Sequence, residues 1–576
     1  MRNNGDNSLG ETNVAADTIA QTTPNKDTGW QIQTLCDWGE PKELMTKAGI
    51  RILRKSAPNP HFWDAWKSGK IALKEAGISV VRDDRTSEWE ICWWAPMAED
   101  VLERRAESVM ASSAVDADLA VPVPDGLSLM PFQRAGVSFA LGRRDTLFAD
   151  EMGLGKTVQA IATANVFRPA SILIVCPSSL KINWQREWSK WSTLGYRISI
   201  DSATEWDEEA QVHIVNYDVL AKPFLMTRTT GKTWGMLVAD ESHYIKNPKA
   251  ARTEALLSIR ADRRLFLTGT PVLNRPVELY SILSAMGVPF AASWKKYTQR
   301  YCNATWTGFG WDVNGASHTE ELATKLRETV MVRRRKHDVL TDMPEKTVSM
   351  VVLPSNGATA VIKSESSAWM RYEQKSAGAK TDLARIRKNG LADTDEYRAA
   401  VQRLRGCFAE FSEIGRIRHQ TALRKIPHVV DAAVETVASA GCCVIFAHHK
   451  DVIAGIVSGL NENGISASAV TGDTDLYERQ RIVDDFQAGA IQVFVGSIRA
   501  CGTGLTLTRS SNVIFAELDW TPSTIAQAED RCHRIGQRNA VLVRHMVFDG
   551  TVDAMLAAKI IDKTDIIESI MADDID

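Results

Sequence analysis

Hydrophobic runs alternate with helix-like stretches from about residue 146 to the end of the chain. Strands are predicted in the first half at TLFAD, SILIVCP, QVHIVNY, GMLVAD and RRLFLTG, and in the second half at CCVIFAHH, SASAVTG, QVFVGS and SNVIFAEL. These runs are apolar at nearly every position, which is typical of strands buried on both faces of a parallel sheet. The pattern therefore predicts an α/β fold with two tandem parallel-sheet lobes covered by helices.

Other regions depart from this rhythm. Residues 1–29 are rich in Asn, Thr, Gly and Asp, which predicts a flexible tail. Residues 30–115 carry many tryptophans and predict a small accessory domain, in which we interpret the tryptophans as core rather than as base-stacking platforms. Residues 346–415 are charged and helix-like, and predict a helical insertion or linker with a face suited equally to solvent or to DNA. The lobes are then 116–345, with a helical protrusion after about residue 285, and 416–576.

Composition narrows the class of protein. The 576 residues are 44% hydrophobic and 24% charged, as in an ordinary soluble globular protein. The chain has neither an apolar run long enough to cross a bilayer nor a secretory signal, so we expect a cytoplasmic protein without a membrane partner. The lack of basic nuclear-import blocks and histone-reader modules favours a bacterial or phage-infected host. The nine cysteines form no C-x-x-C pair and are expected to be reduced and buried.

The segment LFADEMGLGKT lies between a predicted strand and an Ala-rich helix. It nearly fits the phosphate-binding pattern G-x-x-x-x-G-K-[ST], but Asp150 stands where the first glycine is expected. Gly153 and Gly155 allow the backbone amides to turn inward toward an anion. Lys156 would reach the terminal phosphates and Thr157 would hold Mg²⁺. The segment predicts an ATP site, with a chance match as the alternative.

An acidic pair follows the predicted strand in GMLVADESHYIKN. Successive side chains of a strand point in opposite directions, so one carboxylate can address a metal while its neighbour addresses water. We therefore assign Asp240 to Mg²⁺ and Glu241 to orienting or activating the attacking water. The alternative is an exposed acidic turn.

The segment DWTPSTIAQAEDRCHRIGQ predicts a helix with Thr521 as its N-cap and Gly536 as its C-terminal stop. Within it Gln527, Arg531 and Arg534 lie at i, i+4 and i+7 and share one face. Two arginines presented by the second lobe suit the neutralisation of charge on a phosphate held by the first lobe. A solvated basic stripe is the alternative. If the arginines reach the nucleotide only when the lobes close, hydrolysis drives opening and closing, which describes a motor.

Motifs in a fixed order carry a family resemblance over roughly residues 129 to 560. They are MPFQRAGVSFAL, DEMGLGKT, CPSSLKINWQREWSKW, DESHYIKN, LTGTPVLNRPVELYSIL, RRRKHDVLTDMPEK, VIFAHHKDV, GTGLTLT and QAEDRCHRIGQ. The chain resembles the SWI/SNF-like ATPases of helicase superfamily two, and its DESH box is most similar to the annealing-helicase subgroup. The resemblance implies two RecA-like lobes, and Asp-Glu ahead of the loop glycines, as at Asp150, is common in that family.

The resemblance also implies which residues bind nucleotide and DNA. In that family Gln133 would read the adenine edge with Phe132 packed beside it, and the nucleotide site would comprise Phe132, Gln133, Asp150, Glu151, Met152, Gly153, Leu154, Gly155, Lys156 and Thr157. Contacts along the DNA backbone would come from Pro177, Ser178, Ser179, Thr268, Thr270, Thr503 and Gly504. Thr268 and Thr270 would couple the nucleotide state to DNA. Thr506 stands where many relatives have Asn, and we interpret Trp184, Trp188 and Trp191 as core.

A net charge of −3 means that DNA contacts must come from local patches. RRRK at 333–336 and a set comprising Arg416, Arg418, Arg424 and Lys425 are expected to flank a duplex without reading its sequence. The leading hypothesis is a DNA-stimulated ATPase that translocates on duplex or branched DNA, with ATP and Mg²⁺ as cofactors. The N-terminal region could bind a protein partner. The alternatives are a strand-separating helicase and an ATP-dependent DNA clamp or scaffold without sustained turnover.

Overall fold

A computed structural model describes residues 78–82, 89–93, 106–269, 275–306, 310–388, 394–501 and 504–561. The chain divides into two compact units, Met1–Met110 and Ala111–Asp576. In the first unit, β1 (Ile78–Arg82) and β2 (Trp89–Trp93) form an antiparallel hairpin. The predicted tail and the other tryptophans of the predicted accessory domain lie outside the described residues.

The second unit contains a seven-stranded sheet in the order β11-β3-β8-β7-β4-β6-β5, parallel throughout. Its strands are β3 (Asp145–Phe148), β4 (Ile172–Cys176), β5 (Ile198–Ile200), β6 (Val212–Asn216), β7 (Thr233–Ala239), β8 (Arg260–Leu267) and β11 (Met331–Val332). Every residue of β4 and β6 is buried, which explains their unbroken apolar sequences. This sheet is the core of the first lobe.

Helices cover both faces of this sheet, and apolar clusters fill the space on each side. The α-helices are α5 (Pro131–Leu141), α6 (Lys156–Phe167), α7 (Lys181–Trp191), α8 (Tyr217–Leu220), α9 (Pro223–Thr230), α10 (Ala251–Leu257), α11 (Tyr280–Ala285), α12 (Trp294–Tyr301), α13 (Thr319–Thr329) and α14 (Lys336–Val339). The 3₁₀ turns are η1 (Ser178–Leu180), η2 (Ser242–Ile245), η3 (Pro276–Leu279) and η4 (Pro289–Ala291). The region of the predicted protrusion holds α12, α13 and a small antiparallel pair, β9 (Thr305–Trp306) and β10 (Trp311–Asp312).

The second lobe is built on a six-stranded parallel sheet in the order β12-β17-β16-β13-β15-β14. Its strands are β12 (Lys346–Leu353), β13 (Cys443–Ala447), β14 (Ala467–Val470), β15 (Val493–Ser497), β16 (Asn512–Phe515) and β17 (Val541–Phe548). Its helices include α15 (Thr359–Lys388), α16 (Asp395–Ala440), α17 (Lys450–Glu462), α18 (Leu476–Ala488), α19 (Ile498–Cys501) and α20 (Pro522–Glu529). Two parallel sheets with flanking helices confirm the predicted pair of tandem RecA-like lobes.

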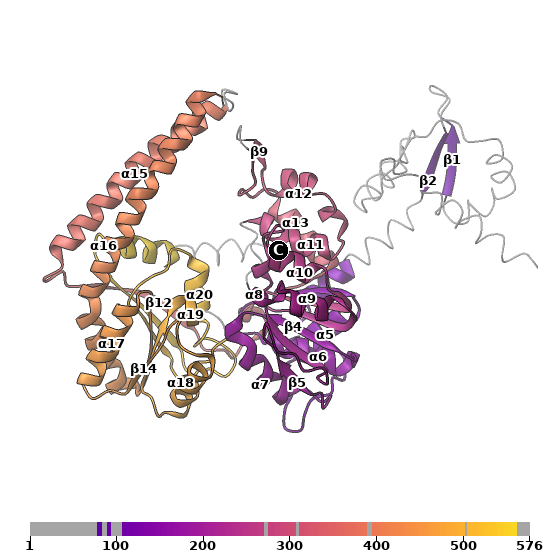
Figure 1. Cartoon of the computed structure of the whole chain (residues 1–576), viewed down its shortest axis with the longest axis horizontal. Helices are drawn as coiled ribbons and strands as arrows, with labels where there is room; N and C mark the ends of the chain where they lie inside the picture. Colours follow the sequence, from indigo (N-terminus) through magenta and orange to yellow (C-terminus); the bar gives the residue numbers. More distant parts are fainter. Residues whose placement is uncertain are drawn as a thin grey trace, which may run out of the picture. The chain divides into compact units, whose positions relative to one another are not determined.

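The charged segment at 346–415 differs in part from the predicted linker. It opens with the edge strand β12, which pairs with β17, and its helix begins only at Thr359. The exposed positions of β12 alternate with partly buried ones, so the strand lacks the continuous apolar run that marks the others. Helices α15 and α16 form a long hairpin, and α16 continues past 415 onto the second sheet (Figure 1).

Two further sequence expectations concern cysteines and membranes. The cysteines whose side chains the structure describes are all free and buried, as expected for reduced thiols. Among the described residues, no helix combines the length and the apolar character needed to cross a membrane.

Candidate functional site

The loop after β3 turns into α6 through two glycines with positive φ, Gly153 at 86° and Gly155 at 77°. This conformation favours glycine, and a Cβ at Gly155 would lie 2.5 Å from Gln133 Nε2. The loop therefore presents backbone amides at the start of a helix, where anions bind well. Lys156 Nζ donates to the carbonyl oxygens of Asp150 at 2.8 Å and Glu151 at 3.3 Å. Burial lowers the pKa of Lys156, while the nearby carboxylates, Glu241 foremost, act in the opposite direction.

Asp150 has a different position from that expected of a nucleotide-binding residue. Its side chain is fully buried and pairs with Arg334, with Oδ2 2.6 Å from Nη2 and Oδ1 3.0 Å from Nε. Gln159 Nε2 also donates to Oδ2, at 2.9 Å. The carboxylate thus fixes the loop to the segment after β11 and does not face a ligand, because its oxygens are occupied by protein donors.

The same contacts correct the interpretation of RRRK as a DNA-facing cluster. Arg334 is 2% exposed and Lys336 is 5% exposed. Arg334 supports the phosphate loop, and Lys336 Nζ bonds to Asp530 Oδ1 at 2.7 Å and to the carbonyl oxygen of His533 at 2.8 Å. The run of basic residues predicted an exposed surface, whereas ion pairs with Asp150 and Asp530 hold the side chains of Arg334 and Lys336 in the interior.

The acidic pair lies at the end of β7, as predicted. Asp240 is buried, and its oxygens accept bonds from Glu241 N to Oδ1 and from Trp184 Nε1 to Oδ2, both at 2.8 Å. Tyr217 Oη donates to the Asp240 carbonyl at 2.7 Å. Burial and the adjacent Glu241 carboxylate raise the pKa of Asp240 to about 6. A carboxylate offers about four lone-pair sites, so two remain for a cation.

Glu241 has an unusual backbone and an unsatisfied oxygen. Its φ of 49° is left-handed, a conformation that costs an L-residue about 1–2 kcal/mol and often marks functional sites. Glu241 Oε2 is buried without a hydrogen bond, although His243 Nδ1 lies 3.3 Å away. Burial alone would raise the pKa of Glu241, but His243, Lys156 and Arg531 hold it below its ordinary value. The side chain is therefore held as an ionised carboxylate, with the His243 ring beside one of its oxygens.

The predicted helix of the second lobe is shorter than expected. Helix α20 ends at Glu529, the Thr521 side chain makes no capping bond, and Arg531 and Arg534 follow in irregular backbone. The two arginine side chains nevertheless lie close together, because both donate to the Leu505 carbonyl oxygen, Arg531 at 3.4 Å and Arg534 at 3.2 Å. The helix-face argument for them was wrong, but the two side chains do lie together.

These two arginines form a cationic site. Among the described residues, no carboxylate lies within ion-pairing distance of either guanidinium, and Arg534 Nη1 donates to Thr506 Oγ1 at 2.9 Å. Desolvation and the neighbouring Arg531 lower the pKa of Arg534 to about 10. A Cβ at Gly153 would lie 3.0 Å from Arg534 Cβ, so Arg534 adjoins the phosphate loop. The arrangement can neutralise an anion bound at that loop.

The other predicted nucleotide-binding residues cluster around the loop. Gln133 Nε2 donates to the Leu154 carbonyl at 3.2 Å, and Gln133 Oε1 accepts from Met130 N at 3.0 Å. Side chains that pack into the core, rather than facing a ligand, are those of Phe132, Met152 and Leu154. The partly exposed residues of the group are Glu151, Gly153, Gly155, Lys156 and Thr157.

The candidate DNA contacts fall into three groups. Thr270 and Thr503 lie outside the described residues. Thr268 is 2% exposed, so its side chain cannot itself touch DNA in this structure. Its neighbour Gly269 packs against the loop after β3, since a Cβ there would lie 2.4 Å from Met152 Cγ. The segment comprising Pro177, Ser178 and Ser179 lies at η1, where Pro177 is buried and Ser178 is exposed. Gly504 adjoins this segment, since a Cβ there would lie 3.7 Å from the Ser179 carbonyl oxygen.

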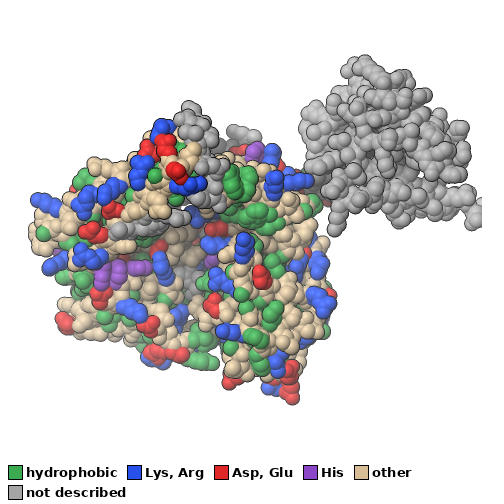
Figure 2. Space-filling view, turned by 45° about the horizontal axis from the view of Figure 1, so that its top comes forward, with side chains coloured by type: hydrophobic (Ala, Val, Ile, Leu, Met, Phe, Trp, Pro, Cys, Tyr) green, Lys and Arg blue, Asp and Glu red, His purple; other side chains and the backbone are tan. Residues whose placement is uncertain are grey.

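The second basic cluster is also partly internal. Lys425 is 1% exposed and bonds to Asp553 Oδ2 at 2.6 Å, while Arg418 pairs with Asp553 Oδ1 at 2.5 Å. Arg416 and Arg424 are exposed. On the face seen in Figure 2, Lys and Arg side chains form separate groups with Asp and Glu among them, rather than one basic surface.

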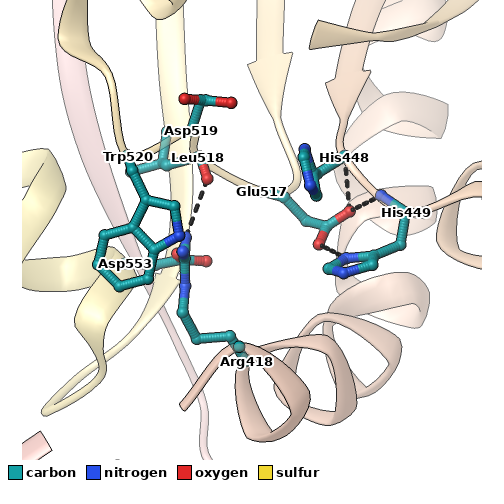
Figure 3. A pocket seen from close by; sticks show the side chains of 9 residues that line it. Arg418, His448, His449, Glu517, Leu518, Asp519, Trp520 and Asp553 are labelled. Atoms are coloured by element: carbon teal, nitrogen blue, oxygen red, sulfur yellow. Dashed lines mark hydrogen bonds and ion pairs between the residues drawn. The ribbon is translucent and has the colours of Figure 1, made fainter. Parts of the chain in front are cut away.

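A pocket in the second lobe lies where α16 meets the segments after β13 and β16 (Figure 3). Its lining comprises Gly415, Arg418, His448, His449, Glu517, Leu518, Asp519, Trp520 and Asp553. Glu517 accepts bonds from the backbone amides of His448 at 2.7 Å and His449 at 2.9 Å, and from the His449 ring at 2.6 Å. Arg418 of α16 in turn donates to the Leu518 carbonyl oxygen at 2.9 Å and pairs with Asp553, so these contacts join α16 to the second sheet.

Three residues important to the site were missed or misjudged from sequence. Trp184 was interpreted as core only, and it is core, but its indole also bonds to Asp240. Tyr217 supports the acidic pair through its hydrogen bond to the Asp240 carbonyl oxygen, and Arg334 supports the loop through its ion pair with Asp150. Helical spacing cannot reveal which buried tryptophan has a polar partner, although a buried indole N–H usually has one.

Comparisons with known proteins follow the same division into two lobes. Residues 132–385 match the model of the SNF2-related domain, and residues 424–536 match that of the helicase conserved C-terminal domain. The ATPase core of Sulfolobus solfataricus SWI2/SNF2 in complex with double-stranded DNA aligns at 22% identity with a TM-score of 0.38, covering 76% of this chain and 92% of that one.

Curated relatives share about a third of their aligned residues with the chain. A Xenopus tropicalis SWI/SNF-related matrix-associated actin-dependent regulator of chromatin subfamily A-like protein 1 is 33% identical over 75% of this chain and 44% of its own length. The Bos taurus DNA annealing helicase and endonuclease ZRANB3 is 34% identical over 75% of this chain and 40% of its own length. A Drosophila melanogaster counterpart of the first is 32% identical over 77% of this chain and 56% of its own length. The chain thus spans about half the length of these relatives.

These relatives overturn one expectation. The cytoplasmic bacterial or phage-infected setting was wrong, because the curated relatives come from animals and are named as a regulator of chromatin and as a DNA annealing helicase. The error came from treating the lack of import signals and reader modules as informative.

Proposed function

The chain belongs to the SWI/SNF-like ATPases of helicase superfamily two, and from this premise we propose that it hydrolyses ATP to translocate on duplex or branched DNA. The observation that carries the proposal is the grouping of Lys156, the acidic pair and two arginines without carboxylate partners around one phosphate-type loop. The relatives that it resembles include proteins named as DNA annealing helicases, which supports DNA as the partner.

The chemistry of the donor set fits a magnesium nucleotide. Positive φ at Gly153 and Gly155 leaves space that a Cβ would fill, and the site carries cations in excess of what the acidic pair balances. Mg²⁺ uses one or two carboxylates together with substrate phosphates, which suits Asp240 and the hydroxyl of Thr157. Asp240 and Thr157 would hold the ion, which would supply positive charge to offset that of the phosphates.

Each remaining side chain has a role that follows from its surroundings. Lys156 would bind the terminal phosphates, and Glu241, an ionised carboxylate whose Oε2 lies 3.3 Å from His243 Nδ1, would accept a proton from the attacking water. Arg531 and Arg534 would stabilise the charge that develops on the transferred phosphoryl group. Gln133 would recognise the adenine edge from the start of α5.

The DNA partner is proposed to bind without sequence preference. Exposed Ser178 at η1 and the adjoining Gly504 bring one segment from each lobe together, which suits contact with a single phosphate backbone. For domains we propose an accessory region at 30–115, a first lobe at 116–345 and a second lobe beginning with β12. The accessory region is proposed to select the DNA structure or a protein partner.

Translocation is tested by ATP-dependent displacement of the third strand from a DNA triplex, with Glu241→Gln as the inactive control. We expect displacement by the wild-type protein and none by the variant. Unwinding of a plain fluorescent duplex would favour a strand-separating helicase instead. Triplexes left intact, together with ATP turnover near zero, would favour the clamp or scaffold and refute the proposal.

A further inference from the structure

The side chain of Trp184 joins two parts of the first lobe that the proposed function treats separately. Its indole Nε1 donates to Asp240 Oδ2 at 2.8 Å, and the ring is fully buried. An indole N–H can only donate, so the contact specifies where the carboxylate oxygen lies. Resting on the proposed function, we propose that Trp184 positions the metal-binding carboxylate of Asp240 and ties it to the DNA-facing segment at η1.

The carboxylate of Asp240 can rotate unless hydrogen bonds hold its oxygens. The terminal torsion of aspartate is soft, so backbone position alone does not fix its oxygens. Besides Trp184, the donor to this carboxylate is the adjacent Glu241 amide, which holds the other oxygen. Without the indole, Oδ2 would lose its only described donor and the carboxylate could rotate away from the cation.

Trp184 is itself held by the apolar core beneath α7. The ring packs in the apolar cluster between α7 and the first sheet, together with Cys176, Leu180 and Trp188. It therefore moves with α7 rather than independently, because closely packed interiors transmit displacement.

Helix α7 also connects Trp184 to the segment proposed to contact DNA. Helix α7 begins at Lys181, directly after η1, and Trp184 lies one helical turn beyond Leu180. A DNA phosphate bound at exposed Ser178 would act on the rigid start of this helix. A shift there reaches Asp240 through one side chain and one hydrogen bond, which offers a physical route by which DNA stimulates hydrolysis.

The test compares Trp184→Phe with Trp188→Phe. The first keeps an aromatic ring and removes the N–H, while the second makes the same change one turn further along α7, at a buried tryptophan for which the structure describes no bond to the acidic pair. Binding of a fluorescent ADP analogue is measured as Mg²⁺ is added, with and without duplex DNA, so the readout does not require turnover. Thermal unfolding of both variants shows that each is folded.

We expect DNA to lower the half-saturating Mg²⁺ concentration of the wild-type protein and of Trp188→Phe. In Trp184→Phe that concentration should rise about tenfold or more, the loss typical when a partner of a metal ligand is removed, and DNA should no longer change it. A Trp184→Phe variant that titrates like Trp188→Phe, or that keeps the full DNA effect, overturns the inference. A wild-type protein without any Mg²⁺-dependent nucleotide binding instead refutes the proposed function.

Discussion

Single side chains explain why the site suits a polyphosphate. Burial lowers the pKa of Lys156, and desolvation lowers that of Arg534, because both charged forms are removed from water. A bound anion would offset this desolvation free energy. Glu241 stays ionised beside them. A bound anion would therefore improve the balance of charge at the site.

Lys156 and Glu241 should give opposite phenotypes. Lys156→Ala removes the charge expected to hold the terminal phosphates and should abolish detectable ATP binding. Glu241→Gln keeps the shape of the side chain but removes the proton acceptor, so binding should persist while hydrolysis stops. Fluorescent-nucleotide titration and steady-state hydrolysis separate the two. Equal ATP affinity in the wild type and Lys156→Ala would contradict the assignment.

Arg534 should matter to the rate more than to binding. Arg534→Ala removes a cation expected to act on the transferred phosphoryl group, and kcat for ATP should fall by about 10³-fold or more with a smaller change in KM. The matched control is Arg538→Ala, an exposed arginine four residues later. A loss of kcat that is the same in both variants would show that Arg534 has no special part in the reaction.

Asp150 should be a stability residue. Asp150→Asn leaves the buried Arg334 guanidinium without its carboxylate, which typically costs about 3–5 kcal/mol of unfolding free energy. Denaturant titration measures the loss. Adding Arg334→Gln should recover part of it, because the unpaired charge is then gone. A single variant as stable as the wild type would show that the pair is not what fixes the loop.

At the scale of elements, the strands were predictable where both faces are buried. β4 and β13 stand out as apolar runs because every position is covered. The half-exposed edge strand β12 was taken for part of a linker. The end of α20 was also missed, because the chain leaves the helix to place Arg531 and Arg534 at the Leu505 carbonyl, a tertiary contact that local caps do not encode.

The junction between β13 and β16 should depend on pH. The Glu517 bond raises the pKa of His449 from 6.5, so the pair's contribution to stability is full below that value and is lost as pH rises through the folded pKa. Although burial opposes it, His449 lowers the pKa of Glu517 from 4.5, so that contribution is lost as pH falls through the folded value. The pair should stabilise most between about pH 4.5 and 6.5.

Melting temperature against pH tests this junction. His449→Gln should lower the melting temperature more at pH 5.5 than at pH 8.5. His337→Gln, at a fully exposed histidine, serves as the control and should change little at either pH. An equal loss at both pH values for His449→Gln would show that protonation of this histidine does not contribute.

At the scale of the whole molecule, the ordered motifs predicted the family and the two lobes correctly. The prediction succeeded because the phosphate loop, the acidic pair and the arginine segment are each short continuous stretches, whose residue types can be read directly from the sequence. Long-range pairs such as Asp150 with Arg334 and Trp184 with Asp240 were not predictable, since the partners lie 184 and 56 positions apart. The DNA-facing interpretation of the basic clusters was partly wrong, because the sequence does not show whether a basic side chain faces DNA or pairs with a buried carboxylate.

The most direct test of the account is steady-state ATP hydrolysis without nucleic acid and with single-stranded, duplex and forked DNA, at two salt concentrations. We predict strong stimulation by duplex or forked DNA that weakens at higher salt, because phosphate contacts release counterions. Hydrolysis unchanged by any DNA, or stimulated by single strands alone, would contradict a motor that tracks along duplex DNA.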